Sequence, residues 1–131
     1  VRLLNRTSER ARALAGELGG SIHAADWTAR AAALDGAALL VNTTSLGMHG
    51  QPPLDLALDA LPPRALVTDV VYTPLITPLL ALAQARGNPV VDGLGMLLHQ
   101  ARPGFRAWFG VDPEVDDDLR AVVAAGLPQT G

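Results

Sequence analysis

Four residues near the start of the chain have types and spacing suited to holding a phosphate group. Asn5, Arg6 and Thr7 follow directly after a short predicted strand at residues 1–4, and Arg10 comes one helical turn later. Guanidinium groups match the geometry of phosphate oxygens, and residues three or four apart on a helix share a face. We therefore expect an anion-binding corner here. The alternative is an ordinary strand-to-helix corner with solvated arginines.

A second polar group, residues 42–48, follows the continuous apolar run 38–41. The small hydroxyl side chains of Thr43 and Thr44, together with free backbone amides at a strand end, suit contacts with a sugar or a diphosphate. An ordinary hydrogen-bonded turn is the alternative. Tyr72 stands just past the next predicted strand, residues 65–71. Its phenol could hydrogen-bond a polyol or a carboxylate, although a lone tyrosine in this place can equally be a half-buried packing residue.

A third group lies at the start of a long predicted helix. Gly93, Met96 and Gln100 are spaced to share one helix face. Glycine allows a ligand to approach the backbone, methionine offers a soft apolar contact to a flat ring, and glutamine both donates and accepts hydrogen bonds. Leu94, with other leucines on the opposite side, is expected to face the core.

The elements that carry these groups alternate between strand and helix, which predicts a parallel, doubly wound α/β sheet. In such sheets, ligands bind at the carboxyl ends of the strands, where all three groups lie. When the ligand is a dinucleotide, an acid at the end of the second strand selects NAD and an arginine selects NADP, so Arg6 predicts NADP. We expect strands at 1–4, 21–24, 38–41, 65–71 and 89–91, and helices at 8–18, 26–34, 77–86, 94–109 and 112–126.

The composition fits one globular domain. The 131 residues are 49% hydrophobic and carry a net charge of −3, which argues against a general nucleic-acid surface. There is no cysteine, and the three histidines have no metal-ligand spacing, so we expect no metal site. No apolar run approaches a membrane span and no leader is visible, which makes the cytoplasm the default expectation. All ten basic residues are arginine, so no lysine within the chain can act as a base.

Taken together, these motifs resemble the shikimate dehydrogenase family over about residues 1–112. Each motif is weak alone, whereas their order and spacing are specific. The matching residues are Asn5-Arg6-Thr7 with Arg10; Asn42-x-Thr44-Ser45-x-Gly47-Met48-x-Gly50; Asp69-x-x-Tyr72-x-Pro74; Thr77-Pro78-Leu79-Leu80; Asp92-Gly93-Leu94-Gly95-Met96-Leu97-x-x-Gln100; and Phe105, Trp108 and Gly110.

The resemblance implies the reduction of 3-dehydroshikimate to shikimate with NADPH, in aromatic amino-acid biosynthesis. It assigns three sets of contacts and no catalytic residue within the chain. By this resemblance, the adenosine 2′-phosphate is contacted by Asn5, Arg6, Thr7 and Arg10. The ribose and nicotinamide are contacted by Thr43, Thr44, the Val70 backbone, Gly93 and Met96. The substrate is contacted by Tyr72 and Gln100.

The chain departs from the family pattern at several points. The family carries its catalytic Lys–Asp pair on an N-terminal substrate domain, and this chain has no lysine. In the family, a Gly-rich turn and the first, central strand of the sheet come before the strand that matches residues 1–4. Neither is found in this sequence. We therefore expect residues 1–131 to be an incomplete NADP-binding Rossmann-like domain, with residues 94–126 as C-terminal helices and 127–131 as a tail. We expect it to be inactive alone and partnered by its N-terminal domain, without nucleic acid or membrane; a homodimer stays open.

Two other functions remain open at this point. One is a quinate/shikimate dehydrogenase of the same superfamily, and the other is a non-catalytic NADP-binding module. Separately, Pro103 falls inside the long predicted helix, where a proline costs about 3 kcal/mol unless the helix bends or breaks. We expect a bend after Gln100 that leaves the ligand-facing half intact.

Overall fold

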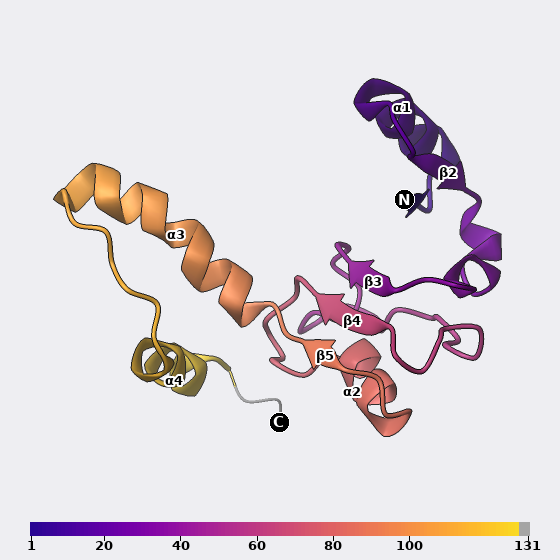
Figure 1. Cartoon of the computed structure of the whole chain (residues 1–131). Helices are drawn as coiled ribbons and strands as arrows, with labels where there is room; N and C mark the ends of the chain where they lie inside the picture. Colours follow the sequence, from indigo (N-terminus) through magenta and orange to yellow (C-terminus); the bar gives the residue numbers. More distant parts are fainter. Residues whose placement is uncertain (129–131) are drawn as a thin grey trace. The chain divides into compact units, whose positions relative to one another are not determined.

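A computed structural model describes residues 1–128, in which short parallel strands alternate with helices (Figure 1). Every strand pair in this part of the chain is parallel, which confirms the predicted α/β class. The elements are β1 (Arg2–Leu4), α1 (Ser8–Leu18), β2 (His23–Ala25), the 3₁₀ turns η1 (Trp27–Ala29) and η2 (Ala32–Leu34), β3 (Leu39–Asn42), β4 (Leu66–Asp69), α2 (Pro78–Ala85), β5 (Val90–Val91), α3 (Leu94–Phe109) and α4 (Asp117–Gly126).

The chain divides into two compact units. The first unit comprises Val1–Ala38 and Asp55–Pro63, and the second comprises Leu39–Leu54 and the chain from Arg64 onward. The strands divide in the same way, because β1 pairs with β2 in one sheet while β3, β4 and β5 form another in that order. Among the described residues, β1 and β3 therefore each have a single strand neighbour.

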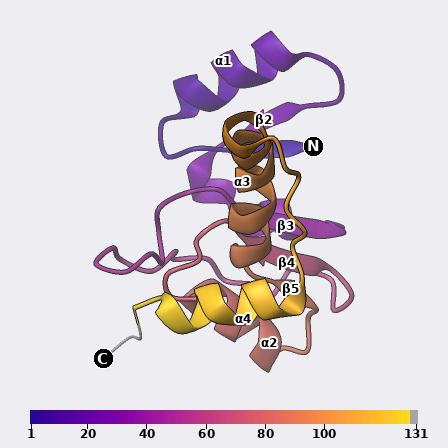
Figure 2. The same ribbon diagram turned by 90° about the vertical axis from the view of Figure 1, so that its left-hand side faces the viewer.

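The first unit is a two-stranded sheet with α1 packed against it (Figures 1 and 2). Ala11 of α1 is buried, whereas Leu14 and Leu18 of the same helix are exposed. Trp27 is half-buried, with the Arg30 guanidinium 5.5 Å from its ring centroid. Arg30 also donates to the Asp55 carboxylate at 2.6 Å, which ties segment 55–63 to the rest of this unit.

The second unit has its core between β4 and α2, which lie against each other (Figure 2). Val67 on β4 and Leu80 on α2 are completely buried there. The start of α2 matches the prediction, because the Thr77 hydroxyl accepts from the Leu80 amide at 3.4 Å and Pro78 occupies the first turn.

The C-terminal helices α3 and α4 belong to the second unit. Arg120 of α4 donates to the Asp92 carboxylate at 2.6 Å, and Asp92 also accepts from the Leu94 amide at 3.0 Å at the start of α3. The outer half of α3 is largely exposed, including a Trp108 side chain that is 80% accessible. We call this apolar surface the α3 aromatic face; it consists of Phe105, Trp108, Phe109 and the adjacent Val111.

Two sequence expectations about local structure are wrong. Residues 26–34 form two 3₁₀ turns rather than one helix. Helix α4 begins at Asp117 with Asp116 as its cap, not at residue 112, and residues 111–116 form no helix or strand. Helix α3 continues through Pro103 from residue 94 to residue 109, so it does not break there, and the expected bend after Gln100 stays a prediction. The ligand-facing half that precedes this proline is helical, as expected.

Strand β3 also differs from expectation. A continuous apolar run such as 38–41 is typical of a strand buried on both faces, but Leu39 is 51% and Val41 is 43% exposed. The physical reason is that β3 has β4 on one edge and no strand on the other within residues 1–128. No helix in that range has the length and apolar character needed to cross a membrane. The predicted tail lies mainly outside the described residues, at 129–131, and the predicted extent of the domain stays a prediction.

Candidate functional site

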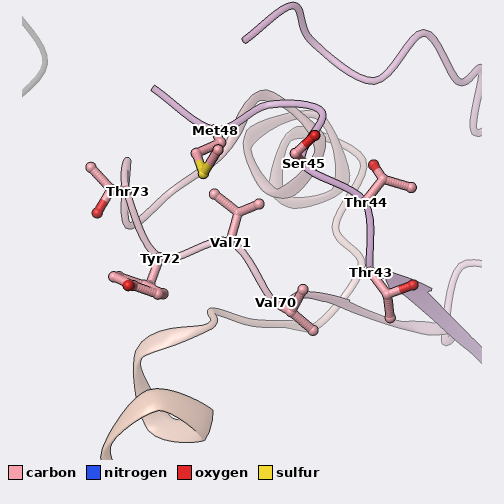
Figure 3. Close-up of a pocket in the computed structure, with 8 residues that line it drawn as sticks. All are labelled: Thr43, Thr44, Ser45, Met48, Val70, Val71, Tyr72 and Thr73. Carbon is pink, nitrogen blue, oxygen red and sulfur yellow. The ribbon is translucent and has the colours of Figure 1, made fainter. Parts of the chain in front are cut away.

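A shallow pocket of about 280 Å³ lies at the carboxyl ends of β3 and β4, in the second unit (Figure 3). One wall is the loop after β3 and the other is the loop after β4. Four residues predicted from the sequence meet here: Thr43, Thr44, Val70 and Tyr72. The volume lies just below the usual range of about 300–1,000 Å³ for small-molecule sites. The other lining residues, not singled out before, are Ser45, Met48, Val71 and Thr73.

The first wall is shaped by a buried amide. The Asn42 side-chain oxygen accepts from the Thr44 amide at 3.0 Å and from the Thr44 hydroxyl at 2.8 Å, while its nitrogen donates to the Leu46 carbonyl at 3.1 Å. The Thr44 hydroxyl is thus already used to fold the loop, and it also accepts from the Leu46 amide. The Thr43 side chain is exposed and hydrogen-bonds no other described residue, so its hydroxyl is available to a ligand.

The second wall is shaped by Asp69, the last residue of β4. Its carboxylate accepts from the Val71 amide at 3.0 Å and from the Thr77 hydroxyl at 2.7 Å. It also accepts from the Asn42 side chain at 3.1 Å, which joins the two walls. Sequence analysis missed the role of this residue. The available signal was that Asn42 and Asp69 are the polar last residues of two neighbouring apolar strands, and these two residues are register partners.

Tyr72 lies in the second wall, half-buried, and the structure gives its phenol no hydrogen-bond partner within residues 1–128. The two walls are joined again beside it, where the His49 amide donates to the Thr73 carbonyl at 2.8 Å. The Tyr72 hydroxyl is therefore free to contact a polar ligand. The same residue also has the packing role that was the alternative interpretation.

Residue 93 must be a glycine because of the backbone of the chain itself, whereas the expected reason was the approach of a ligand. A Cβ atom there would lie 2.5 Å from the Val70 carbonyl oxygen and 2.7 Å from that of Val71, so the backbone of the chain itself fills the space. The start of α3 thereby packs against the second wall. Met96 and Gln100 are exposed farther along α3, and neither lines the pocket.

The predicted phosphate corner lies in the first unit, after β1. The Asn5 side chain accepts from the Thr7 amide at 2.9 Å and so fixes a tight turn. The side chains of Arg6 and Arg10 are exposed and form no hydrogen bond or ion pair within residues 1–128. Their charges are therefore available to an anion.

Sequence analysis missed an acid near that corner. Asp26, directly after β2, accepts from the Ser8 hydroxyl at 3.4 Å, at the start of α1. Hydrogen bonds from the Thr28 hydroxyl at 2.6 Å and the Thr28 amide at 2.8 Å lower the pKa of Asp26 below its usual value of 3.8. The corner thus combines two free arginines with one carboxylate that is already hydrogen-bonded. No cluster of three or more metal-ligand side chains occurs within the described part of the chain.

Comparison with known proteins gives a consistent result. The family model for the shikimate 5′-dehydrogenase C-terminal domain matches residues 93–123. The chain is 63% identical over 123 residues to a shikimate dehydrogenase (NADP(+)) of Paramagnetospirillum magneticum, covering 94% of this chain and 45% of the relative. It is 66% identical over 125 residues to the protein of the same name in Rhodospirillum rubrum, covering 92% and 44%. The chain thus spans less than half the length of these relatives.

Solved structures show the same likeness. Quinate dehydrogenase from Corynebacterium glutamicum in complex with NAD matches with a TM-score of 0.83 and 29% identity, covering 95% of this chain and 45% of that one. Shikimate 5-dehydrogenase from Thermus thermophilus in complex with NADP(H) and shikimate matches with a TM-score of 0.76 and 35% identity, covering 96% and 45%. The Rossmann-like fold class predicted from the sequence is thereby confirmed.

Proposed function

Because this chain belongs to the shikimate dehydrogenase family, we propose that it is the C-terminal, NADP-binding part of an enzyme that reduces 3-dehydroshikimate to shikimate with NADPH. The observation that carries the proposal is the pocket at the ends of β3 and β4, where Thr43, Thr44, Val70 and Tyr72 meet. Ligands of doubly wound sheets bind at this edge. The names of the relatives, which specify NADP(+), support the choice of cofactor.

The adenosine end of NADP binds at the corner after β1. Arg6 and Arg10 pair with the 2′-phosphate, since neither guanidinium is used elsewhere in the described chain. Asn5 and Thr7 form the turn that presents Arg6. Asp26 stands beside this corner, but hydrogen bonds from Thr28 already occupy its carboxylate.

The nicotinamide end binds along the pocket in the second unit. The Thr43 hydroxyl contacts a ribose, and the Thr44 and Val70 backbones form the wall beside it. The roles of Gly93 and Met96 differ: Gly93 sets how closely α3 approaches Val70, and the exposed Met96 thioether provides an apolar contact for the ring.

The substrate contacts come from Tyr72 and Gln100, both of which have side-chain polar groups without partners in the described chain. Bound NADPH would supply the hydride, and this chain holds the cofactor and one side of the substrate. The chain contains no lysine, so the Lys–Asp pair of the family must come from residues outside these 131. We expect no turnover by this chain alone.

Residues 1–131 then form one incomplete cofactor domain, with the C-terminal helices at 94–126 and the end of the chain as a tail. Its partner is the N-terminal substrate domain, and the α3 aromatic face is the apolar surface suited to packing against it. We place the protein in the cytoplasm, without nucleic-acid or membrane partners. A homodimer stays a prediction.

A quinate dehydrogenase is the second candidate, because such an enzyme with bound NAD is among the matching structures. The first and second candidates differ in the cofactor that they bind, which carries a phosphate at the 2′ position in NADP and a hydroxyl in NAD. Arg6 favours NADP. A non-catalytic NADP-binding module is the third candidate. Such a module does not need the substrate contacts that Tyr72 and Gln100 provide.

Calorimetric titration of the complete natural protein with NADP and with NAD, followed by oxidation assays with shikimate and quinate, separates these candidates. Tight NADP binding and shikimate oxidation are expected. Preference for NAD and quinate would support the second candidate, and NADP binding without turnover would support the third. Failure to bind either cofactor would contradict all three.

A further inference from the structure

The buried Asp69 carboxylate joins three segments of the second unit, which is more than any side chain that lines the pocket joins. It is 1% exposed, and each of its hydrogen-bond partners is a donor. One donor is the Asn42 side chain of the first wall, another is the Val71 amide of the second wall, and the third is the Thr77 hydroxyl at the cap of α2. A carboxylate accepts from all three at once, which a neutral amide in the same place cannot do.

The effect of Asp69 extends to α3 through the Val70 backbone. Its bond to the Val71 amide sets the turn that contains Val70, and the Val70 amide in turn donates to the Asn42 carbonyl at 3.0 Å. Gly93 packs directly on the Val70 carbonyl, with no room for a Cβ atom. The position of the first turn of α3 therefore depends on Asp69. The contacts that connect them are made by the backbone, which leaves little room for adjustment.

We propose that Asp69 is the positioning residue of this site: with Asn42 and Thr77, it holds both walls of the pocket and the start of α3 in the arrangement that binds the cofactor. This inference rests on the proposed function, since it names the part of the chain that shapes the NADP site. Asp69 does not line the pocket, so it acts through Asn42, Val71 and Thr77 rather than by touching a ligand.

Replacing Asp69 by Asn turns one acceptor into a donor that faces the Asn42 side-chain nitrogen. In the complete natural protein, we expect Asp69→Asn to weaken NADP binding by about tenfold or more, as for the loss of a hydrogen bond to a charged group. The matched control is Asn88→Ala. Asn88 is also buried and donates to the Ala65 carbonyl at 3.0 Å, but at the opposite end of the same sheet. It should lower stability and leave the NADP affinity of the folded protein unchanged.

Rescue distinguishes positioning from general destabilisation. Adding Asn42→Asp to Asp69→Asn restores a donor–acceptor pair between the two strand ends, so the double variant should recover part of the affinity. If Asp69→Asn does not fold, Thr77→Val and Thr77→Ser replace it. Valine removes one donor to Asp69 and should weaken binding severalfold, whereas serine keeps the hydroxyl and should not. Unchanged affinity in Asp69→Asn or Thr77→Val, or an equal loss in Asn88→Ala, would overturn the proposal.

Amide hydrogen exchange keeps this test independent of the proposed function. The Val71 and Thr44 amides donate to Asp69 and Asn42, so both should exchange slowly in the native protein and much faster in Asp69→Asn. They should remain slow in Asn88→Ala. If the native protein does not bind NADP, the proposed function fails while this measurement still decides the positioning role. Fast exchange at both amides in the native protein would refute that role.

Discussion

The close approach of α3 to the β4 loop yields a paired test at two glycines. At Gly93, a Cβ atom would lie 2.5 Å from the Val70 carbonyl oxygen, 2.7 Å from its carbon and 2.7 Å from the Val71 carbonyl oxygen. Ordinary contact begins near 3.4 Å, so the backbones must separate by about 0.9 Å. At Gly95, two residues later, a Cβ atom would meet nothing within 4 Å.

The two alanine substitutions should therefore have opposite signs. Overpacking at Gly93 costs about 1–3 kcal/mol, and the lower entropy of the unfolded chain offsets about 0.4–1 kcal/mol of this. We expect Gly93→Ala to destabilise by a net of about 1–2 kcal/mol. Gly95→Ala, where the added Cβ atom would meet no neighbour in the first helical turn, should stabilise by about 0.5–1 kcal/mol.

The assay is urea denaturation of the complete natural protein, monitored by circular dichroism. The comparison uses transition midpoints at constant slope, because a change in slope would indicate altered compactness instead. Equal midpoints for the two variants, or a Gly93→Ala protein as stable as the native one, would show that the start of α3 is not held against Val70 in solution.

Three other predictions concern charged groups. Arg6→Ala should weaken NADP binding by about 1.5–3 kcal/mol and leave NAD binding nearly unchanged, measured by calorimetry; Arg12→Ala, exposed on the following helix α1, is the control, and equal losses for both cofactors would refute the assignment. Arg120→Ala should destabilise by about 1 kcal/mol in thermal melts, since its ion pair is short but partly solvated; no change would mean that α4 is held by apolar contacts alone. Hydrogen bonds from Thr28 lower the pKa of Asp26, so its contribution to stability is complete above about pH 3.8 and is lost as the pH falls through the lowered value. NMR titration of the Asp26 carboxyl carbon should give a midpoint below 3.8, and a midpoint at or above that value would contradict the hydrogen-bonded cap.

The sequence predicted the second unit well because its signals are local. The Thr77-Pro78 pair marked the start of α2, and the bounds of α3 were predicted at residues 94 and 109, where the structure has them. Thr43, Thr44 and Tyr72 were predicted from their places at strand ends, and Val70 from the family resemblance; parallel strands bring such places to one edge.

The misses arise where neighbours in space decide the outcome. The apolar composition of β3 suggested burial, but a strand is buried only if elements cover it, and β3 has a single strand neighbour in the described chain. Residues 26–34 carry a helix cap at Asp26, yet this short segment forms two 3₁₀ turns, because a short helix gains few hydrogen bonds for its nucleation cost. The aspartates at 112 and 116–118 could each cap α4 on sequence grounds. In the structure the cap is Asp116, while Asp112 pairs with Arg102 at 3.0 Å.

The network around Asp69 could not be predicted for a related reason. Its residues, Asn42, Asp69 and Thr77, are separated by 27 and 8 positions along the chain, and each alone is compatible with an ordinary turn or cap. Only the register that pairs Asn42 with Asp69 shows that one carboxylate serves both loops.

The two tryptophans give the protein a built-in optical label for each unit. Trp27, with Arg30 over its ring, belongs to the first unit, and Trp108, on α3, belongs to the second. Trp108 is 80% exposed, so its fluorescence should resemble that of the free indole in water and shift to shorter wavelength when another surface covers α3. Replacing either tryptophan by phenylalanine isolates the other emission. The unfolding of one unit and the covering of the other can then be followed separately in the same sample.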